Sequence, residues 1–362
     1  MWNTKKALVY VGIPLGGFLI VTTIALLFIF CFNNPGSAVP VPDTTGPKLV
    51  IDHDGGADDA LAITMSLLYE KYFNGPKLVA LTTSYGNVNL SQAIINSARI
   101  LELCDRTDIP IYKGAERTLI SGIVSDYFFG FDGLGDDGYT RLEPVTVQNV
   151  HSAIGLIELS KKYEGDLIIM AIGPATNLAL AIRMDPGFID RLAQLYVGAG
   201  HIHSASNQEP EFNAAMDPEA YHIVTESARA DKVTLVPFSQ IYGSMNITKD
   251  WRQNVLGAID TPIMKALNGY ERLSLAAASV WTLLDPAVAA IVLDNNVAKE
   301  FKNTTNGIIL CGEERGINTN NLTSAEPNSR LVYSGYVDKY KQLLIDIYRA
   351  ELIQRKEICP KK

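Results

Sequence analysis

Four aspartates stand close together in a segment that begins as an apolar run. The segment VIDHDGGADDA, residues 50–60, contains Asp52, Asp54, Asp58 and Asp59. Carboxylates held this close repel one another and raise one another's pKa unless a positive group lies among them. The first question that the sequence raises is therefore which positive partner offsets their charge.

Two hypotheses account for the aspartates. Helix capping is the first, because Asp58 or Asp59 can cap the helix that follows, where the helix dipole favours negative charge. Capping explains one or two carboxylates, whereas Gly55 and Gly56 predict a tight turn that folds all four toward each other. The second hypothesis is a bound cation. Oxygen ligands at this density suit calcium or magnesium, and no His/Cys pattern for zinc accompanies them, so we predict a calcium or magnesium site.

The apolar pattern indicates the elements that must position these residues. From Lys48 onward, short apolar runs alternate with helical patterns, which predicts a single α/β domain with a mainly parallel, Rossmann-like central sheet flanked by helices. After Asp285 the pattern predicts a short helix, a strand pair around 307–316 and an amphipathic helix over 337–352. The earlier predicted strands cover 48–52, 77–84, 166–173, 194–200 and 233–239, with helices over 60–72, 90–103 and 177–184.

The aspartates follow the first predicted strand, and three other polar segments follow later strands. These segments are Thr82–Asn87, Ile172–Asn177 and Gly198–His201. Ligands of open α/β sheets bind outside the carboxyl ends of the strands. We therefore expect one site to gather residues from distant parts of the chain.

The order of these segments resembles the inosine-uridine-preferring nucleoside hydrolase family. Five motifs in family order, spanning roughly residues 48–352, carry the resemblance: Asp52-His53-Asp54-Gly55-Gly56-Ala57-Asp58-Asp59, Gly86-Asn87, Gly173-Pro174-Ala175-Thr176-Asn177, Glu211-Phe212-Asn213 with Asp217-Pro218 after it, and Leu284-Asp285-Pro286. The resemblance implies hydrolysis of the N-glycosidic bond of a small-molecule ribonucleoside to a free base and ribose. It also implies a homodimer or homotetramer.

The resemblance further implies one calcium ion and a role for each motif residue. Calcium is then bound by Asp54, Asp59, the main-chain carbonyl of Ile172 and Asp285, with the ribose 2′- and 3′-hydroxyls completing its coordination. Asp54 is the implied catalytic base that deprotonates a calcium-bound water, which attacks C1′. Asp52 supports the ligands, and the implied substrate contacts are Asp58, Asn87, Glu211, Phe212 and Asn213. This allocation fits glycosidic cleavage, which needs a positioned water and a carboxylate near an oxocarbenium-like state.

One departure from the family concerns the leaving base. Several members have a histidine directly before the late aspartate that protonates the base, and this chain has Leu284 there. Either the base leaves by stacking and solvent protonation, or activity has been lost. The aromatic loop 127–134 and the segment around Trp281 supply candidate base contacts in Phe129, Phe131 and Trp281, although core packing is an alternative role for each of them.

Two further positions leave alternatives open. The family commonly has an asparagine six residues before Glu211, and this chain has Ala205, so Asn207 is the candidate substitute. His201 and His203 are candidates for the missing acid, because the pKa of histidine lies near neutrality, but loop histidines are more often inert. The acidic loop FDGLGDDG, residues 131–138, lacks the ligand spacing of an EF-hand and is interpreted as a solvated loop.

The N-terminus departs from the globular pattern. Residues 7–32 carry no charge over 26 positions, which is long enough to span a bilayer, and Lys5 and Lys6 precede them. We therefore expect a short cytosolic segment (1–6), a transmembrane signal anchor or a cleaved signal peptide (7–32), a Pro/Gly-rich stalk (33–47) and a hydrolase-like domain (48–362). The domain would then be extracellular or luminal at the cell surface or in the secretory pathway, and secreted after cleavage.

Sequons and cysteines bear on the same expectation. Sequons begin at Asn89, Asn246, Asn303 and Asn321, although we expect Asn89 to be unmodified or turned away because a glycan there would crowd the ribose pocket. The cysteines are Cys31, Cys104, Cys311 and Cys359. A Cys311–Cys359 bridge with a buried Cys104 is one hypothesis, and three free thiols beyond the apolar span is the other.

Composition and the Asp-x-Asp-Gly start define the competing hypotheses. The net charge of −8 and pI near 5.2 supply no basic surface, so we expect no nucleic-acid partner. A haloacid-dehalogenase-type phosphatase shares Asp52-His53-Asp54-Gly55 but leaves Asp58, Asp59, Asn87 and Asp285 unexplained. A nucleoside-binding surface protein without catalysis is the non-enzyme alternative, and Leu284 is the residue in its favour.

Overall fold

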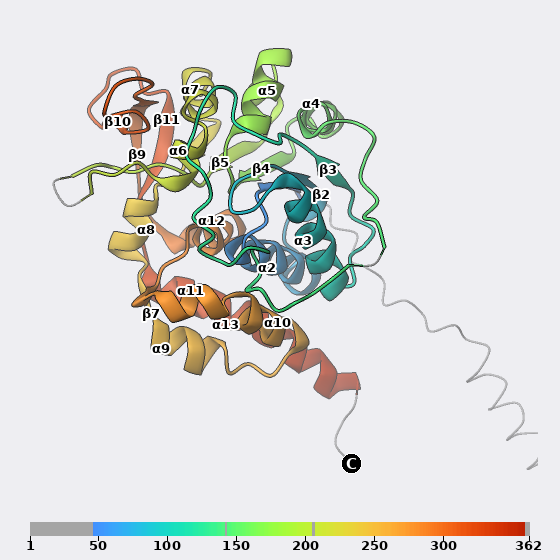
Figure 1. Ribbon diagram of the computed structural model, residues 1–362. Helices are drawn as coiled ribbons and strands as arrows, with labels where there is room; N and C mark the ends of the chain where they lie inside the picture. Colours follow the sequence, from blue (N-terminus) through green and yellow to red (C-terminus); the bar gives the residue numbers. More distant parts are fainter. Residues whose placement is uncertain (1–45, 142, 205–206, 359–362) are drawn as a thin grey trace, which may run out of the picture. The chain divides into compact units, whose positions relative to one another are not determined.

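The computed structural model describes residues 46–141, 143–204 and 207–358, and a nine-stranded sheet runs through this part of the chain (Figure 1). The strands lie in the order β10-β9-β11-β6-β5-β4-β1-β2-β3. Their bounds are β1 (Lys48–His53), β2 (Lys77–Thr83), β3 (Ile111–Lys113), β4 (Leu167–Ala171), β5 (Gln194–Val197), β6 (Val233–Leu235), β9 (Ala298–Ile308), β10 (Asn318–Asn321) and β11 (Ser329–Gly335). A separate two-stranded sheet pairs β7 (Ile247–Thr248) with β8 (Val280–Trp281).

Most of the sheet is parallel. All the pairs from β3 through β1 to β11 run parallel, whereas β9 is antiparallel to both β10 and β11. Leu49, Val50 and Ile51 of β1 are fully buried, as expected for a central parallel strand that is covered on both faces. The prediction of a mainly parallel sheet in an α/β domain is confirmed.

Helices cover both faces of the sheet. Leu49 and Ile51 belong to a core cluster shared with α2, α12 and α13, and Val50 belongs to a second cluster shared with α4, α5 and α7. The helices are α2 (Ala57–Phe73), α3 (Leu90–Leu103), α4 (Ser152–Lys162), α5 (Thr176–Met184), α6 (Phe212–Met216), α7 (Pro218–Glu226), α8 (Phe238–Ser244), α9 (Lys249–Trp251), α10 (Pro262–Tyr270), α11 (Arg272–Ala277), α12 (Leu284–Leu293) and α13 (Val337–Ile358). Short 3₁₀ turns occupy Ile189–Arg191 and Asn295–Val297, and a π turn occupies Arg252–Leu256.

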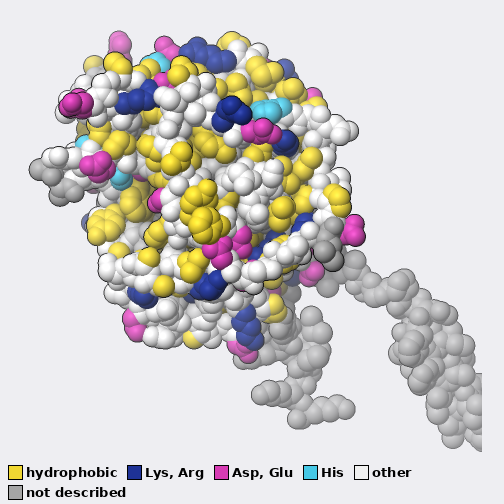
Figure 2. Space-filling view, in the orientation of Figure 1, with side chains coloured by type: hydrophobic (Ala, Val, Ile, Leu, Met, Phe, Trp, Pro, Cys, Tyr) yellow, Lys and Arg dark blue, Asp and Glu magenta, His cyan; other side chains and the backbone are white. Residues whose placement is uncertain are grey.

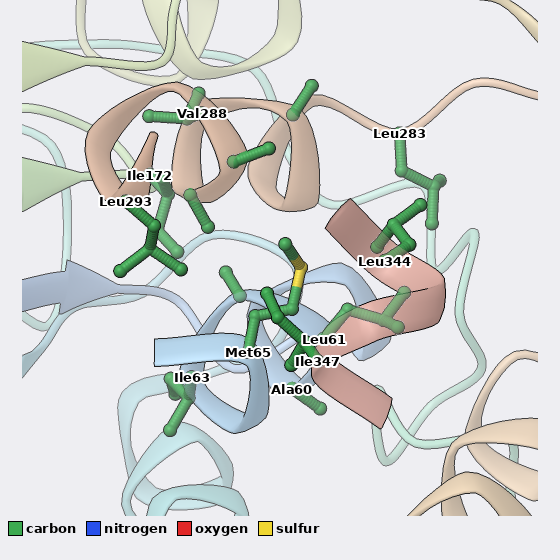
Figure 3. Packing of buried hydrophobic residues seen from close by; sticks show 14 of the residues in the cluster. Ala60, Leu61, Ile63, Met65, Ile172, Leu283, Val288, Leu293, Leu344 and Ile347 are labelled. Carbon is green, nitrogen blue, oxygen red and sulfur yellow. The ribbon is translucent and has the colours of Figure 1, made fainter. Parts of the chain in front are cut away.

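Helix α2 is buried on nearly all sides. Its sequence is apolar around the whole helix rather than along one stripe, which suits a helix inside a core. Figure 3 shows Leu61 and Met65 of α2 on the side of the helix that faces α12 and α13, with Leu344 and Ile347 of α13 close to them. Because Asp58 and Asp59 lie in the first turn of α2, this packing fixes their position.

The C-terminal part differs from the predicted strand pair. Two strands do pair there, but they are β9 and β10, and the segment between them is not a tight turn. Strand β11 and the helices α8 to α11 were not predicted. Strand β11 lies between β9 and β6, so it forms through pairing with residues far away in the sequence.

The predictions for the N-terminus fall outside the described residues. The proposed span at 7–32 and most of the stalk lie there, as does Cys31, and Cys359 of the proposed bridge lies beyond the other end. Among the helices within 46–358, none combines the length and apolar character that crossing a bilayer requires. Cys104 is half-buried and Cys311 is exposed.

A buried ion pair joins the helical segment 249–277 to β8. Arg252 and Glu271 are both fully buried, and the Arg252 Nε donates to Glu271 Oε2 at 2.8 Å. The other carboxylate oxygen, Oε1, accepts the indole N–H of Trp281 at 2.5 Å. Trp281 lies four positions before Asp285, so the pair anchors the chain that leads into α12.

Replacing Arg252 with methionine is expected to lower the free energy of unfolding by about 3–5 kcal/mol, because Glu271 is left buried without its counter-charge. Urea unfolding measures the change. Arg183→Met is the matched control, since its ion pair with Glu226 is more than half exposed and contributes little. An Arg252→Met midpoint equal to that of the control would contradict this role for the buried pair.

Candidate functional site

The polar segments predicted at strand ends meet at the carboxyl ends of the central parallel strands. Strands β2, β1, β4 and β5 are neighbours in the sheet, and each ends here. The turn after β1 contains Gly55 with φ +87°, and a Cβ there would lie 2.7 Å from the Ala93 Cα. Glycine is therefore required for the turn that carries the chain from β1 into α2.

Helix capping accounts for one of the four aspartates. Asp59 Oδ2 accepts the Gly56 N–H at 2.6 Å, and its Oδ1 accepts the Asp54 N–H at 3.3 Å. Asp59 therefore caps the first turn of α2 through the backbone N–H groups that precede it, and Gly56, the N-cap residue, has no side chain to bond in return. The arrangement leaves the charges of Asp54 and Asp58 unexplained.

Three carboxylates converge where two helices begin. Asp58 and Asp59 lie in the first turn of α2, and Asp285 lies in the first turn of α12. One carboxylate oxygen from each lies within 4.8 Å of the other two. The positive ends of two helix dipoles therefore face this group, but they offset only part of its charge.

Burial and mutual repulsion disfavour ionisation of the group. Burial, with a smaller effect from neighbouring carboxylates, raises the pKa of Asp54 to about 7. The same two causes raise the pKa of Asp58, Asp59 and Asp285 well above its ordinary value. A folded protein that keeps these groups ionised at neutral pH needs a positive charge among them.

The described part of the chain does not supply that charge. No lysine or arginine described here forms an ion pair with Asp54, Asp58, Asp59 or Asp285. The nearest basic side chain is His53, whose Nδ1 lies 3.8 Å from Asp59 Oδ1. Burial lowers the pKa of His53 to about 3, so its ring is neutral.

The residues present fit a divalent cation. Asp58 Oδ1 is buried and has no hydrogen-bond partner within the described chain, so it is available to a ligand. The donors are all carboxylate oxygens, which suit calcium or magnesium better than zinc. The group of three differs from the predicted ligand set, because it contains Asp58, which was assigned to the ribose, and does not contain Asp54.

Asp54 is held between the aspartate group and the turn after β2. Its Oδ2 accepts the Asn87 N–H at 2.8 Å. A Cβ at Gly86 would lie 1.8 Å from this same oxygen, so only glycine leaves room for the carboxylate. The Asn87 side chain lies against Gly56, which brings it beside the start of α2.

Asp52 lies behind these residues. Its Oδ1 accepts hydrogen bonds from Thr82 Oγ1 at 2.5 Å and from Asn177 Nδ2 at 2.8 Å. Burial raises its pKa to about 6, although both hydrogen bonds oppose the shift. Asp52 thus ties the ends of β1, β2 and α5 together, a position that suits its predicted supporting role.

The motif Glu211-Phe212-Asn213 lies at the start of α6. The Glu211 carboxylate accepts three backbone N–H groups, from Gly200 at 2.7 Å, Ala214 at 3.0 Å and Asn213 at 3.1 Å. Asn213 Nδ2 donates to the carbonyl oxygen of Ile172 at 3.1 Å. The amide of Asn213 therefore orients the carbonyl that was predicted to bind the metal, while Phe212 is half-buried beside it.

The predicted base contacts are divided between core and surface. Phe129 is 4% exposed and Trp281 is 3% exposed, and both belong to the hydrophobic core. Trp281 also stacks on Tyr340 with ring centroids 6.4 Å apart, so neither residue presents a ring face to a ligand in this conformation. For these two residues the burial favours core packing, the alternative role that the sequence left open, and base contact stays a prediction. Phe131 is 75% exposed and stays a candidate.

The two histidines of the loop after β5 have different surroundings. His203 Nε2 accepts the Asn318 N–H at 3.1 Å and Nδ1 bonds the carbonyl of Asn207, which indicates a structural role. His201 is buried, and burial together with His203 lowers its pKa to about 4.

Ala205 lies outside the described residues. Asp132 and Asp136 bond the backbone of their own loop, in agreement with the interpretation of a solvated loop.

Two residues that position the site were missed from the sequence. Asn96 on α3 donates to the carbonyls of Gly55 and Asp132, each at 2.7 Å, and so joins the aspartate turn to the aromatic loop. Ser125 Oγ donates to the Asn87 carbonyl at 2.6 Å. A polar residue on the buried side of α3 is a weak sequence signal for Asn96, and we find no signal for Ser125.

The chain is similar to known proteins in sequence and in fold. The family model described as "Inosine-uridine preferring nucleoside hydrolase" matches residues 49–342. The chain is 35% identical over 184 residues to "Probable uridine nucleosidase 2" of Arabidopsis thaliana, covering 49% of this chain and 55% of that protein. It is 28% identical over 263 residues to "Inosine-uridine preferring nucleoside hydrolase" of Crithidia fasciculata, covering 69% of this chain and 80% of that protein.

A solved structure extends the comparison to the fold. It is a plant nucleoside hydrolase with a TM-score of 0.74 and 26% sequence identity, and the match covers 83% of this chain and 98% of the other. The matches to uridine nucleosidases span a smaller part of those proteins, between about half and three-fifths of their length. The fold likeness is therefore more extensive than the alignment to these relatives.

In the absence of divalent cations, the free energy of unfolding of the domain is expected to fall as pH rises from about 4 to about 7. The folded pKa values of the buried aspartates lie above the ordinary 3.8, reaching about 7 for Asp54. Their contribution to stability is fully present below the unfolded pKa and is lost as pH rises through the folded pKa. Thermal unfolding in a chelator, compared at pH 5 and pH 7.5, measures the loss.

Adding calcium tests whether a bound cation offsets the repulsion among the ionised aspartates. At 100 times its Kd, a cation that binds only the folded state stabilises by about 2.7 kcal/mol. We expect a larger gain at pH 7.5 than at pH 5, because the carboxylates must be ionised to bind. Equal gains at the two pH values would contradict a carboxylate-bound cation.

Gly86→Ala is expected to abolish most activity without unfolding the domain, because the added methyl group occupies the space of Asp54 Oδ2. Gly243→Ala is the control, since a Cβ there meets nothing within 4 Å. Nucleoside turnover and thermal unfolding, measured on both variants, separate the two effects. Wild-type turnover in Gly86→Ala would show that the position of Asp54 is not critical.

Proposed function

Because the chain belongs to the inosine-uridine preferring nucleoside hydrolase family, we propose that it hydrolyses the N-glycosidic bond of ribonucleosides to a free base and ribose. The observation that carries the proposal is the buried group of Asp58, Asp59 and Asp285, with Asp54 beside it and no described cationic side chain paired to it. A cation and a neutral diol suit such a site, whereas an anionic substrate on its own would add to the repulsion.

We propose calcium as the cation. Asp54, Asp59, Asp285 and the Ile172 carbonyl would hold it, with Asp58 Oδ1 close enough to the group to bind either the ion or a ribose hydroxyl. A bound divalent cation supplies two effects, since it lowers the pKa of a coordinated water and orients a diol. The all-oxygen donor set supports calcium or magnesium, and the family resemblance favours calcium.

Asp54 is the proposed general base. Its pKa of about 7 in the absence of a cation gives the carboxylate enough basicity to accept a proton near neutral pH. The Asn87 N–H fixes Oδ2, so the proton-accepting oxygen has a defined position. A general base in this role contributes typically about 10²–10⁴-fold in rate.

The substrate contacts are proposed from the same carboxyl ends of the strands. Asp58 and Asn87 lie on the β1 and β2 side and would bind the ribose hydroxyls, while Glu211, Phe212 and Asn213 would bind from the β5 side. Glu211 already accepts three backbone N–H groups, so its carboxylate is fixed before any substrate binds. Such fixed groups reduce the ordering that binding requires.

The leaving base receives no acid from the family's histidine position. Leu284 is 6% exposed and carries no proton to donate. The pKa of about 4 makes His201 neutral at pH 7, which makes it a poor proton donor there. We propose that the base departs by stacking and solvent protonation, with exposed Phe131 as the remaining aromatic candidate from the aromatic loop.

Two alternatives are weaker. The phosphatase alternative gains no support from the family match, and it still leaves Asp58, Asp59 and Asp285 without a role. A nucleoside-binding protein without catalysis is favoured by Leu284 alone. Ribose release from inosine or uridine, which a binder does not produce, distinguishes it from a hydrolase.

Location and assembly are proposed from the sequence. We propose that residues 7–32 anchor the chain in a membrane of the cell surface or secretory pathway, with the domain outside the cytosol, and that the domain assembles as a dimer or tetramer. Figure 2 shows basic and acidic side chains interspersed on one face with no large basic area, which supports a small-molecule substrate rather than nucleic acid.

Asp54→Asn is expected to reduce ribose release by at least about 10²-fold, because the amide cannot accept the proton. A reducing-sugar assay over purine and pyrimidine nucleosides, with calcium present, measures it. Asp190→Asn, which changes an exposed aspartate far from the site, is the control.

Chelation of the wild-type enzyme is expected to abolish ribose release, and calcium should restore it. The same assay, run with chelator and then with added calcium, measures both steps. Full activity in the chelator would overturn the calcium-dependent mechanism while leaving a metal-free hydrolase open.

A further inference from the structure

Strand β10, one of the two edge strands of the nine-stranded sheet, forms an uncharged polar face together with β9. Edge strand β10 pairs with β9, and Asn321 lies opposite Thr305. Side chains of a strand alternate between its two faces, so Asn303 lies on the same face as Thr305 and therefore on the same face as Asn321. We call this the β9–β10 outer face and define it by Asn303, Thr305, Thr319 and Asn321.

Burial agrees with the register. All four residues of the β9–β10 outer face are exposed, whereas Thr304, Asn306 and Asn318 on the opposite face are buried. On that buried face Asn306 Oδ1 accepts the Tyr221 hydroxyl at 3.0 Å. The outer face consequently points to solvent and makes no contact with the core.

Two of the four sequons in the chain lie on this one face. Asn303-Thr304-Thr305 lies on β9 and Asn321-Leu322-Thr323 begins on β10. Diagonal neighbours on one face of an antiparallel pair lie about 7–8 Å apart, so the two asparagines are close in space although distant in sequence. The sequence alone did not reveal this pairing.

We propose that Asn303 and Asn321 are N-glycosylation sites, and that their glycans cover the β10 edge of the sheet. In the transfer, the amide Nδ2 of each asparagine attacks C1 of an oligosaccharide linked to a polyprenyl diphosphate. The new bond is C1–Nδ2, the bond from C1 to the diphosphate oxygen breaks, the lipid diphosphate leaves, and the amide nitrogen loses one proton to a base. The modification adds a bulky, solubilising group to a surface position.

The edge position gives the glycans a physical role. An edge strand carries N–H and C=O groups that can pair with another chain, and proteins commonly block this with charges or proline. On β10 the Asn318 N–H is already bound by His203 Nε2 at 3.1 Å, so the loop after β5 covers that end of the strand. The β9–β10 outer face has neither charges nor proline, since its side chains are asparagine and threonine only. Glycans at Asn303 and Asn321 would block pairing at β10 and would place any subunit interface elsewhere.

The other two sequons differ in position. Asn89 is exposed, but its side chain caps α3 by accepting the Gln92 N–H at 3.0 Å, two residues after Asn87 of the site. Asn246 is exposed between α8 and β7. Neither lies on the sheet edge, so these sequons serve as internal comparisons for the edge pair.

The test expresses the full chain in a eukaryotic secretory host and treats it with a peptide N-glycosidase, which converts each glycan-carrying asparagine to aspartate. Peptide mass spectrometry then reads every sequon. We expect conversion at both Asn303 and Asn321. Conversion at Asn89 or Asn246 alone, or at no sequon, would overturn the proposal.

Matched variants separate glycan loss from structural damage. Thr305→Ala and Thr323→Ala each remove one sequon. On a denaturing gel, each variant should run lower than the unmodified sequence by the mass of one glycan. Thr305→Ser and Thr323→Ser keep both the sequon and the hydroxyl, so their gel mobility should not change. A change of mobility in the serine variants would contradict the assignment. The double alanine variant should self-associate more, as measured by light scattering, and an unchanged mass distribution would refute the proposed role at the edge.

The readout does not depend on the proposed hydrolase activity. Five strands, β9, β11, β6, β5 and β4, lie between β10 and β1, which carries the aspartates. Ribose release from inosine, measured before and after glycan removal, should be the same. Protein that is glycosylated but inactive would refute the hydrolase proposal and leave the glycan proposal standing. Protein that is active but not glycosylated would refute the glycan proposal and leave the hydrolase proposal standing.

Discussion

The repulsion among buried carboxylates is the constraint that shapes this domain. Asp54, Asp58, Asp59 and Asp285 lie where α2 and α12 begin, and burial raises the pKa of each. Such a group is unfavourable on its own, because charged groups lose hydration and repel one another. It persists only if the surrounding structure holds the carboxylates in place and a ligand supplies positive charge.

The rest of the fold supplies that support. Helix α2 is buried between the sheet, α12 and α13, so the two helix starts cannot move apart without opening the core. Glycines at 55 and 86 leave space where any side chain would push on the turn or on Asp54. The Arg252–Glu271 pair and Trp281 anchor the chain that leads into Asp285. Stability and site geometry therefore depend on the same contacts.

The departures from the family pattern lie at the periphery of this centre. Leu284 directly precedes Asp285 and is buried, so the position where several family members have a histidine holds a side chain with no proton to donate, beside the group of Asp58, Asp59 and Asp285. Two of the three aromatic side chains named as candidate base contacts, Phe129 and Trp281, are buried in the core.

The sequence by itself determined the parts of the structure that depend on neighbouring residues. The strand and helix alternation and the turn after β1 follow from local apolar pattern and glycine, and the charge of the aspartates predicts a cation. The role proposed for each motif residue comes from the resemblance. The resemblance grouped Asp285 with Asp54 and Asp59 as metal ligands, and only the tertiary structure places one oxygen of Asp285 within 4.8 Å of Asp58 and Asp59.

Only the tertiary structure decided the contacts between distant segments. Aromatic residues in a loop look alike in sequence whether they face a ligand or the core, and packing alone placed Phe129 and Trp281 inside. Strand β11 forms by pairing with two other strands, and the pairing of β9 with β10 puts Asn303 and Asn321 on one face. These outcomes depend on register and burial, which are set by the whole chain, and no local pattern encodes them.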